Sequence, residues 1–79
     1  MDATDLDLDL KGLKCPLPVL KARKAMARLA AGTRVRIEAT DPMSVIDIPH
    51  FCQEAGHALV SRDQDGEVHV FVIERGPTT

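Results

Sequence analysis

Alternating hydrophobic and polar residues predict two β-strands in the first half of the chain. In residues 5–10 leucines alternate with aspartates, and in residues 33–40 apolar residues alternate with charged ones. A period of two places successive side chains on opposite faces of a strand. The buried faces are therefore expected to be Leu6, Leu8 and Leu10 in the first strand, and Val35, Ile37 and Ala39 in the second.

Two further strands are predicted near the end of the chain, in residues 58–62 and 67–74. Asp65-Gly66 lies between them and is a dipeptide typical of tight hairpin turns, because glycine accepts a positive φ. If Val68, Val70 and Val72 face the helices, then Phe71 and Ile73 face outward and offer a weak contact surface.

A helical period of 3.6 residues appears in residues 16–31, between the first two strands. Gly32 is a natural stop for this helix. The apolar sector holds Pro18, Ala22, Ala25, Met26 and Leu29, and the opposite side holds Lys21, Lys24 and Arg28. Leu17 and Leu20 fall toward the polar side.

A second helix is predicted from about Ser44 to Ala55, ending at Gly56. Asp41-Pro42 precedes it, with the aspartate expected to supply the cap and the proline a preset φ. Pro49 lies inside this helix, and we expect it to kink the helix or confine the regular part to the C-terminal half.

The resulting order, βαβαββ, predicts an α+β fold. Because the strands alternate, one face of the sheet is covered and the other is open to solvent. We expect a two-layer α/β sandwich in which both helices pack on one face of a mixed four-stranded sheet. Residues 5–75 form one domain in this interpretation, and residues 1–4 and 76–79 are flexible termini.

Composition narrows the class of protein. The chain has 79 residues, of which 44% are hydrophobic, and it lacks Trp and Tyr. Such a chain can form one small core of aliphatic residues. No apolar run approaches the roughly 20 residues of a membrane helix, and the acidic start is unlike a secretory signal. We therefore expect a cytoplasmic protein whose two cysteines stay reduced.

The positive charge is concentrated around one cysteine. Eight of the ten Lys and Arg residues lie in residues 11–36, and none of the twelve acidic residues does. Cys15 lies in this segment, beside Lys14 and at the expected start of the first helix. A helix start and nearby cations favour a thiolate. Since Pro16 and Pro18 have no N–H, the nearest free donors are expected to be those of Leu17 and Val19.

Cys15 is accordingly the candidate nucleophile, at the exposed end of the sheet where open α/β folds place functional groups. Cys52 lies among apolar residues of the second helix and is interpreted as a core residue. The topology places Cys52 about 12 Å or more from the edge that carries Cys15, too far for a disulfide.

Metal and cofactor sites are not indicated. His50, His57 and His69 show no ligand spacing with a cysteine on a shared face, and glycines are too scattered for a phosphate-binding loop. His50 is two positions from Cys52 on the same helix and is expected to point elsewhere. No cofactor and no metal are therefore expected.

Cys15-Pro16-Leu17-Pro18 resembles the Cys-Pro-x-Pro motif of the TusA-like (SirA-like) sulfur-carrier family. The resemblance extends over roughly residues 6–75. The stretches that carry it are residues 10–14, residues 18–21, Thr40-Asp41-Pro42 and Asp47-Ile48-Pro49.

This resemblance implies a two-layer α/β sandwich and a carrier that holds sulfane sulfur on Cys15 as a persulfide, with Pro16 and Pro18 framing the site. The implied donor is a cysteine desulfurase or a rhodanese. The implied acceptors are proteins of tRNA thiolation, molybdenum-cofactor assembly or sulfur oxidation. Lys14, Leu17, Lys21 and Lys24 are candidate docking residues for such partners.

Two other functions stay open. The basic face of the first helix could serve a nucleic-acid-binding or regulatory module, although the chain is net acidic and nearly without aromatics for base stacking. A thiol-redox protein would need a resolving cysteine within reach of Cys15. No direct nucleic-acid contact and no membrane contact are expected.

Overall fold

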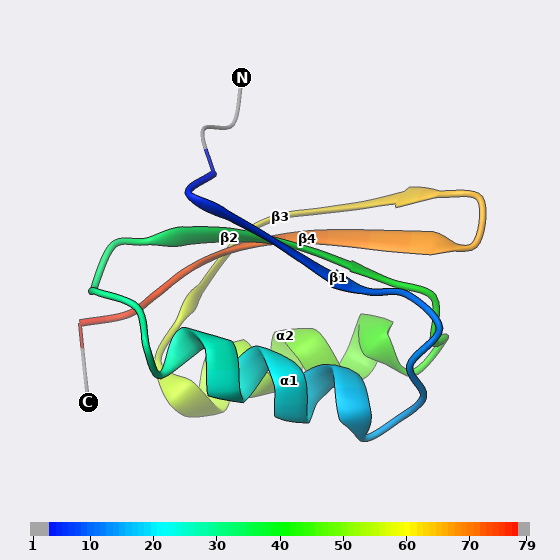
Figure 1. Ribbon diagram of the computed structural model, residues 1–79, viewed down its shortest axis with the longest axis horizontal. Helices are drawn as coiled ribbons and strands as arrows, with labels where there is room; N and C mark the ends of the chain where they lie inside the picture. The colour runs from blue at the N-terminus through cyan, green and yellow to red at the C-terminus, as the bar shows by residue number, and fades with distance from the viewer. Residues whose placement is uncertain (1–3, 78–79) are drawn as a thin grey trace.

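The computed structural model describes residues 4–77 and forms a mixed four-stranded sheet with two helices on one face (Figure 1). This arrangement confirms the predicted βαβαββ order and the two-layer α+β architecture. The elements are β1 (Leu6–Leu10), α1 (Leu17–Met26), β2 (Arg34–Ala39), α2 (Ser44–Ala55), β3 (Ala58–Asp65) and β4 (Val68–Glu74).

The order of strands in the sheet is β1-β2-β4-β3. β1 and β2 are parallel, whereas β4 is antiparallel to both β2 and β3. Because β1 and β2 run the same way, their C-terminal ends meet at one edge of the sheet, which we call the carboxyl edge. Both helices begin at this edge (Figure 1). The loops that precede them therefore lie close together.

The core lies between the helices and the facing side of the sheet. Val35, Ile37 and Ala39 of β2 are fully buried, as the alternation predicts. Leu10 is buried and Leu8 packs against the core, so α1 covers this part of the leucine face of β1 as expected. Leu6, also expected to be buried, is 38% exposed.

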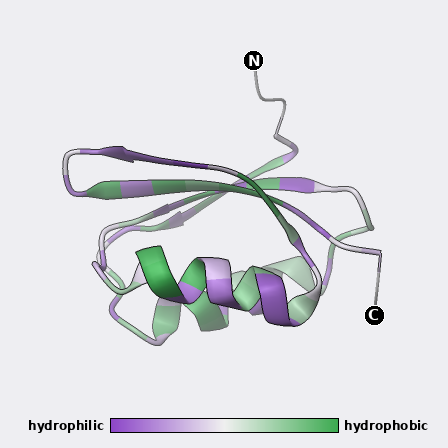
Figure 2. Cartoon of the chain, turned by 180° about the vertical axis from the view of Figure 1, so that it is seen from behind, coloured by the Kyte–Doolittle hydropathy of each residue, from purple (hydrophilic) through white to green (hydrophobic). Residues whose placement is uncertain are grey.

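The predicted orientation of β4 is wrong. Phe71 pairs with Ile37 and Ile73 with Val35, and directly opposed residues share a face of the sheet. Phe71 and Ile73 are consequently buried against the helices, and the alternate valines lie on the outer face. The strand is hydrophobic along most of its length, whereas β3 is largely hydrophilic (Figure 2). A nearly continuous apolar strand lacks the alternation that would identify its buried face.

α1 is shorter than predicted and ends at Met26 instead of residue 31. After Met26 the backbone hydrogen bonds join residues three apart instead of four, as in the bond from the Leu29 N–H to the Met26 carbonyl at 3.1 Å. The Arg75 Nε also donates to the Met26 carbonyl at 3.1 Å. A cation from the end of β4 thus caps the C-terminus of α1, where the helix dipole favours positive charge.

α2 has the predicted bounds, and Gly56 ends it with a left-handed φ of 79°. Pro49 does not confine the helix to its C-terminal half. Because Pro49 has no N–H, the carbonyl four residues earlier, that of Val45, lacks its partner within the helix. The Arg62 Nη2 of β3 donates to this carbonyl at 3.4 Å, which compensates for the missing helical bond.

The β3–β4 hairpin extends further than predicted, since β3 continues to Asp65 and pairs there with Val68. The loop residues are therefore Gly66 and Glu67 instead of Asp65-Gly66, with Gly66 at a φ of 61°. Of the termini predicted to be flexible, residues 1–3 and 78–79 lie outside the described residues. Gly76 differs from that expectation, because it is buried and its N–H donates to His57 Nδ1 at 2.9 Å.

Candidate functional site

Cys15 lies at the carboxyl edge, in the connection from β1 to α1. Pro16 is the N-cap residue of α1, so Cys15 lies one residue before the helix cap. The Cys15–Pro16 peptide bond is cis. The side chain of Cys15 is exposed to solvent, as the sequence predicts, whereas Pro18, in the first turn of α1, is buried. The sulfur is therefore accessible to another protein.

Two carboxylates from the β2–α2 side of the carboxyl edge contact Cys15. The Cys15 backbone N–H donates to Asp41 Oδ2 at 2.6 Å. The Cys15 Sγ donates to Asp47 Oδ2 at 3.1 Å. Asp47 lies in the first turn of α2, where the helix dipole stabilises its negative charge. The site thus joins two helix starts that are far apart in the chain.

Asp41 has a different role from the one predicted. The N-cap residue of α2 is Met43, without a side-chain cap bond. The other carboxylate oxygen of Asp41 accepts the Met43 N–H at 3.3 Å, within the turn that precedes the helix. Asp41 therefore fixes this turn to Cys15 and does not cap the helix itself.

The charged and polar neighbours of Cys15 raise the pKa of its thiol, whereas its position in the sequence predicts a thiolate. The hydrogen bond to Asp47 raises the pKa of the Cys15 thiol most, followed by burial and by the charges of Asp47 and Asp41. The Leu17 N–H, expected to be one of the nearest free donors to Cys15, donates instead to the Lys14 carbonyl at 2.8 Å. These neighbours therefore favour the thiol form of Cys15 over the thiolate.

Cys52 is confirmed as a core residue. It is 2% exposed, and burial raises the pKa of its thiol to about 11. Both cysteines are free thiols. Cys15 is therefore the only accessible sulfur nucleophile of the two.

A hollow of about 240 Å³ opens beside Cys15 and runs between α1 and α2 as far as Arg23 and Glu54. His50, predicted to point away from Cys52, lies at this hollow, and its Nε2 is 3.3 Å from Glu54 Oε1. The lining comprises Cys15, Pro16, Val19, Arg23, Asp47, His50, Phe51 and Glu54. The reactive sulfur thus adjoins a surface that is partly apolar and partly charged.

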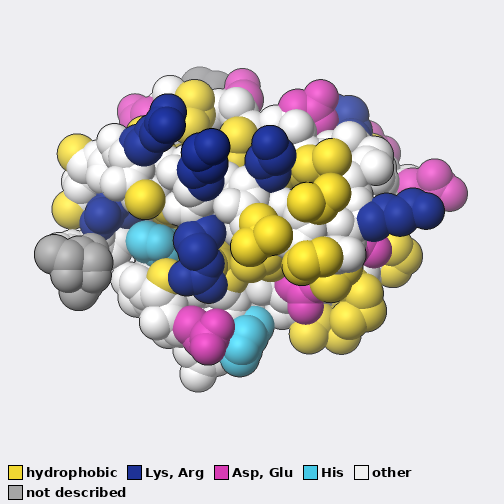
Figure 3. Space-filling view, turned by 60° about the horizontal axis from the view of Figure 1, so that its bottom comes forward, with side chains coloured by type: hydrophobic (Ala, Val, Ile, Leu, Met, Phe, Trp, Pro, Cys, Tyr) yellow, Lys and Arg dark blue, Asp and Glu magenta, His cyan; other side chains and the backbone are white. Residues whose placement is uncertain are grey.

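A collar of exposed apolar side chains surrounds the carboxyl edge. Leu17 and Leu20 of α1 are 44% and 52% exposed, and Met43 and Ile46 at the start of α2 are 45% and 60% exposed. We call these four residues the apolar collar. In Figure 3, hydrophobic side chains gather beside a row of Lys and Arg. Exposed apolar side chains on the elements that carry an accessible thiol offer a surface on which another protein can dock.

The predicted docking residues are all exposed, but sequence reasoning missed half of the site. Lys21 and Lys24 lie along α1 on the same exposed side as Leu17 and Leu20. Asp41, Asp47, Met43 and Ile46 come from the β2–α2 connection and α2 and were not predicted as site residues. The available signal was topological, because parallel neighbouring strands bring their following loops to one edge.

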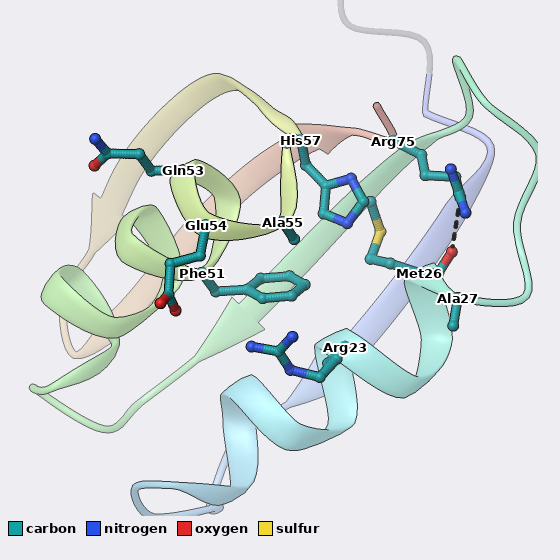
Figure 4. Close-up of a pocket in the computed structure, with 10 residues that line it drawn as sticks. Arg23, Met26, Ala27, Phe51, Gln53, Glu54, Ala55, His57 and Arg75 are labelled. Carbon is teal, nitrogen blue, oxygen red and sulfur yellow. Dashed lines mark hydrogen bonds between the residues drawn. The ribbon is translucent and has the colours of Figure 1, made fainter. Parts of the chain in front are cut away.

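A second hollow, of about 450 Å³, lies at the other end of the helices (Figure 4). The Arg23 guanidinium lies 5.0 Å from the centre of the Phe51 ring, and the His57 ring meets the same ring edge-on at 5.4 Å. Both helices end here, so their dipoles disfavour an anion. Arg23 and Arg75 are explained as cations at helix C-termini, and we assign this hollow a structural role.

His57 makes stability depend on pH. Burial lowers its pKa, and the positive charges of Arg75 and Arg23 lower it further. As the pH falls through 6.5, the ordinary pKa of histidine, the unfolded chain therefore binds more protons than the folded protein does. The contribution of neutral His57 to stability is consequently lost as the pH falls. We expect the urea midpoint to drop between pH about 7.5 and about 5.5, and to drop less in His57→Asn, which keeps an acceptor for Gly76. Equal drops in both proteins would contradict this role.

Within residues 4–77 the structure has neither a membrane-spanning helix nor a cluster of metal ligands. No helix in this range is long and apolar enough to cross a membrane. The same range contains no group of three or more His, Cys, Asp or Glu side chains that could hold a metal ion.

Comparison with known proteins agrees with the motif at Cys15. The family described as Sulfurtransferase TusA matches residues 6–75. A protein of Neisseria meningitidis serogroup A is 39% identical over 67 residues, which cover 85% of this chain and 90% of that protein. The sulfur carrier protein TusA of Allochromatium vinosum is 37% identical over 71 residues, 90% of this chain and 93% of the relative.

A solved structure shows the same fold. The crystal structure of a SirA-like protein from Desulfitobacterium hafniense superposes with a TM-score of 0.79 at 27% identity. The match covers 90% of this chain and 97% of the other. Sequence and fold therefore point to one family over nearly the whole chain.

Proposed function

Because this chain belongs to the TusA sulfurtransferase family of sulfur carriers, we propose that it accepts sulfane sulfur on Cys15 as a persulfide and passes it to an acceptor protein. The observation that supports this function most directly is the exposure of Cys15 at the carboxyl edge, while Cys52 is buried. Sulfur relay between proteins requires a thiol that a partner's sulfur can approach. The docking surface around Cys15 supplies that access.

The proposed donor is a cysteine desulfurase or a rhodanese, and the proposed acceptors belong to tRNA thiolation, molybdenum-cofactor assembly or sulfur oxidation. We place the relay in the cytoplasm, where thiols remain reduced. The raised pKa of Cys15 fits such a relay, because an unpaired carrier stays a thiol and resists oxidation until a partner binds.

Loading tests this proposal. The reduced protein is incubated with a cysteine desulfurase and cysteine, or with a rhodanese and thiosulfate, and analysed by intact mass spectrometry. We expect a mass gain of one or more sulfur atoms that dithiothreitol reverses. No gain with either donor system would contradict the proposal.

We further propose that partners dock on the apolar collar, with Lys14, Lys21 and Lys24 contacting acidic residues at the rim of the partner's surface. The charges favour a net-acidic partner surface. A nucleic-acid partner is disfavoured, because Phe51 and Phe71 are the only Phe, Trp or Tyr residues and both are buried. The apolar collar is better suited to contact with another protein.

Leu20→Asp tests the docking surface. A charge in the collar is expected to weaken binding to the desulfurase at least tenfold, since a buried unpaired carboxylate is costly at an interface. Val60→Asp is the matched control, because Val60 is an exposed apolar residue of β3, away from the carboxyl edge. Binding constants from calorimetry would measure both. Equal weakening by both variants would rule out the collar as the docking surface.

A further inference from the structure

The contact between Cys15 and Asp47 depends on whether the sulfur carries a proton. In the structure the thiol donates to Asp47 Oδ2 at 3.1 Å. This bond needs the S–H hydrogen, because a carboxylate at neutral pH is an acceptor only. Asp47 is in the first turn of α2, and Asp41 fixes the preceding turn to the Cys15 backbone. The helix that carries Asp47 and the turn that precedes it are therefore both positioned beside Cys15.

Loading with sulfur removes this bond. In a persulfide, Sγ is bonded to carbon and to the outer sulfur, and it has no hydrogen to donate. The outer sulfur lies one S–S bond, about 2 Å, further from Cβ. A persulfide is a stronger acid than a thiol, so the loaded side chain carries a negative charge close to Asp47. The attraction of the unloaded state becomes a repulsion in the loaded state.

We propose that Asp47 is a positioning residue that stabilises the unloaded carrier relative to the loaded one, and thereby favours release of sulfur to an acceptor. This inference rests on the proposed function and states which direction of sulfur transfer the site favours. Because the site is exposed, water screens the contact and the bias is moderate. The carrier can then accept sulfur from a donor and still give it up.

The transfer step is balanced without an oxidant or reductant. The Cys15 thiol loses its proton to solvent, and the thiolate attacks the outer sulfur of the donor persulfide. The bond between Sγ and that sulfur forms, the S–S bond of the donor breaks, and the electron pair of that bond leaves with the donor sulfur as a thiolate, which takes up a proton. The net reaction exchanges one thiol and one persulfide for another persulfide and thiol.

Other charged groups face the same place and are part of any pH response. Arg23 from α1 and His50 and Glu54 from α2 line the hollow with Asp47, and Asp41 approaches from the β2–α2 turn. Asp47 is distinguished from all of them by its direct bond to the sulfur. Its effect on the sulfur should therefore exceed that of the other charges.

The test is an equilibrium partition of sulfur. Wild type, Asp47→Asn and Asp7→Asn are each equilibrated with glutathione and glutathione persulfide at one fixed ratio, and the loaded fraction is read by intact mass. Asp7 is the matched control, because it is an exposed aspartate of β1. We expect the ratio of loaded to unloaded protein to rise about fivefold in Asp47→Asn and to stay unchanged in Asp7→Asn.

A second readout separates this role from a purely structural one. The rate of Cys15 alkylation by iodoacetamide is measured against pH, and its midpoint is expected to move to lower pH in Asp47→Asn only. Asp47→Ser removes the same charge and replaces Asp47→Asn if that variant does not fold. An unchanged or lower loaded ratio in the charge-free variant would overturn the inference and leave the carrier function standing. Absence of loading in the wild type would instead refute the proposed function.

Discussion

Replacing Cys15 by serine is expected to abolish sulfur loading. A serine hydroxyl is not ionised at neutral pH and does not attack a persulfide, so it does not replace the thiol. Cys52 does not compensate, because it is 2% exposed and its thiol has a pKa of about 11. Loading by a desulfurase, followed by intact mass spectrometry, should show no reducible mass gain in Cys15→Ser.

The matched control is Cys52→Ala, which removes the other thiol without placing a polar group in the core. This variant is expected to load to the wild-type extent. Loading that persists in Cys15→Ser and disappears in Cys52→Ala would reverse the assignment of the two cysteines. Loss in both variants would mean that the two thiols act together, as in a redox protein.

Phe51→Ala is expected to cause the largest loss of stability. Phe51 is 1% exposed, belongs to the hydrophobic core and contacts Arg23 and His57 with its ring. Truncation of a buried phenylalanine costs about 3–5 kcal/mol. A domain of this size has a free energy of unfolding of about 0.05–0.15 kcal/mol per residue, so the variant should lose a large fraction of its stability.

Urea denaturation followed by circular dichroism measures this effect. Leu20→Ala is the control, because Leu20 is an exposed apolar residue of α1, and its free energy of unfolding should change by about 0.5 kcal/mol or less. Equal midpoints for Phe51→Ala and the wild type would contradict the position of Phe51 in the core.

Local patterns in the sequence predicted most of the fold. β1 and β2 each have one apolar face, and their alternation identified it correctly. Asp41-Pro42 and Gly56 bracket α2, whose bounds were predicted. β4 was assigned the wrong face, because its face is chosen by its register with β2, and register is a property of the sheet and not of the strand.

The end of α1 and the course of α2 depended on distant side chains. Arg75 approaches the Met26 carbonyl from the other end of the chain, and Arg62 compensates for Pro49 from a different strand. Sequence periodicity contains no information on such partners. The prediction therefore placed the end of α1 too late and assigned Pro49 too disruptive a role.

The chemistry of the site was predicted in part. Cys15 was identified from its motif and its place before a helix. Its ionisation was predicted with the wrong sign, because neighbours in the chain, such as Lys14, were weighed and neighbours in space were not. Asp41 and Asp47 lie 26 and 32 residues further along the chain and reach Cys15 only through the parallel pairing of β1 and β2.

Sulfur transfer from the isolated, loaded protein tests the carrier function most directly. The protein is loaded by a desulfurase with cysteine carrying an isotopic sulfur label, separated from the donor, and mixed with reduced glutathione. We expect the label to be found on the Cys15 peptide before mixing. Afterwards it should be found on glutathione as its persulfide, together with labelled sulfide formed where a second glutathione reduces that persulfide to glutathione disulfide, and the two products together should equal the label lost from the protein. Label on any other residue, or label that stays on the protein, would contradict a sulfur carrier acting through Cys15.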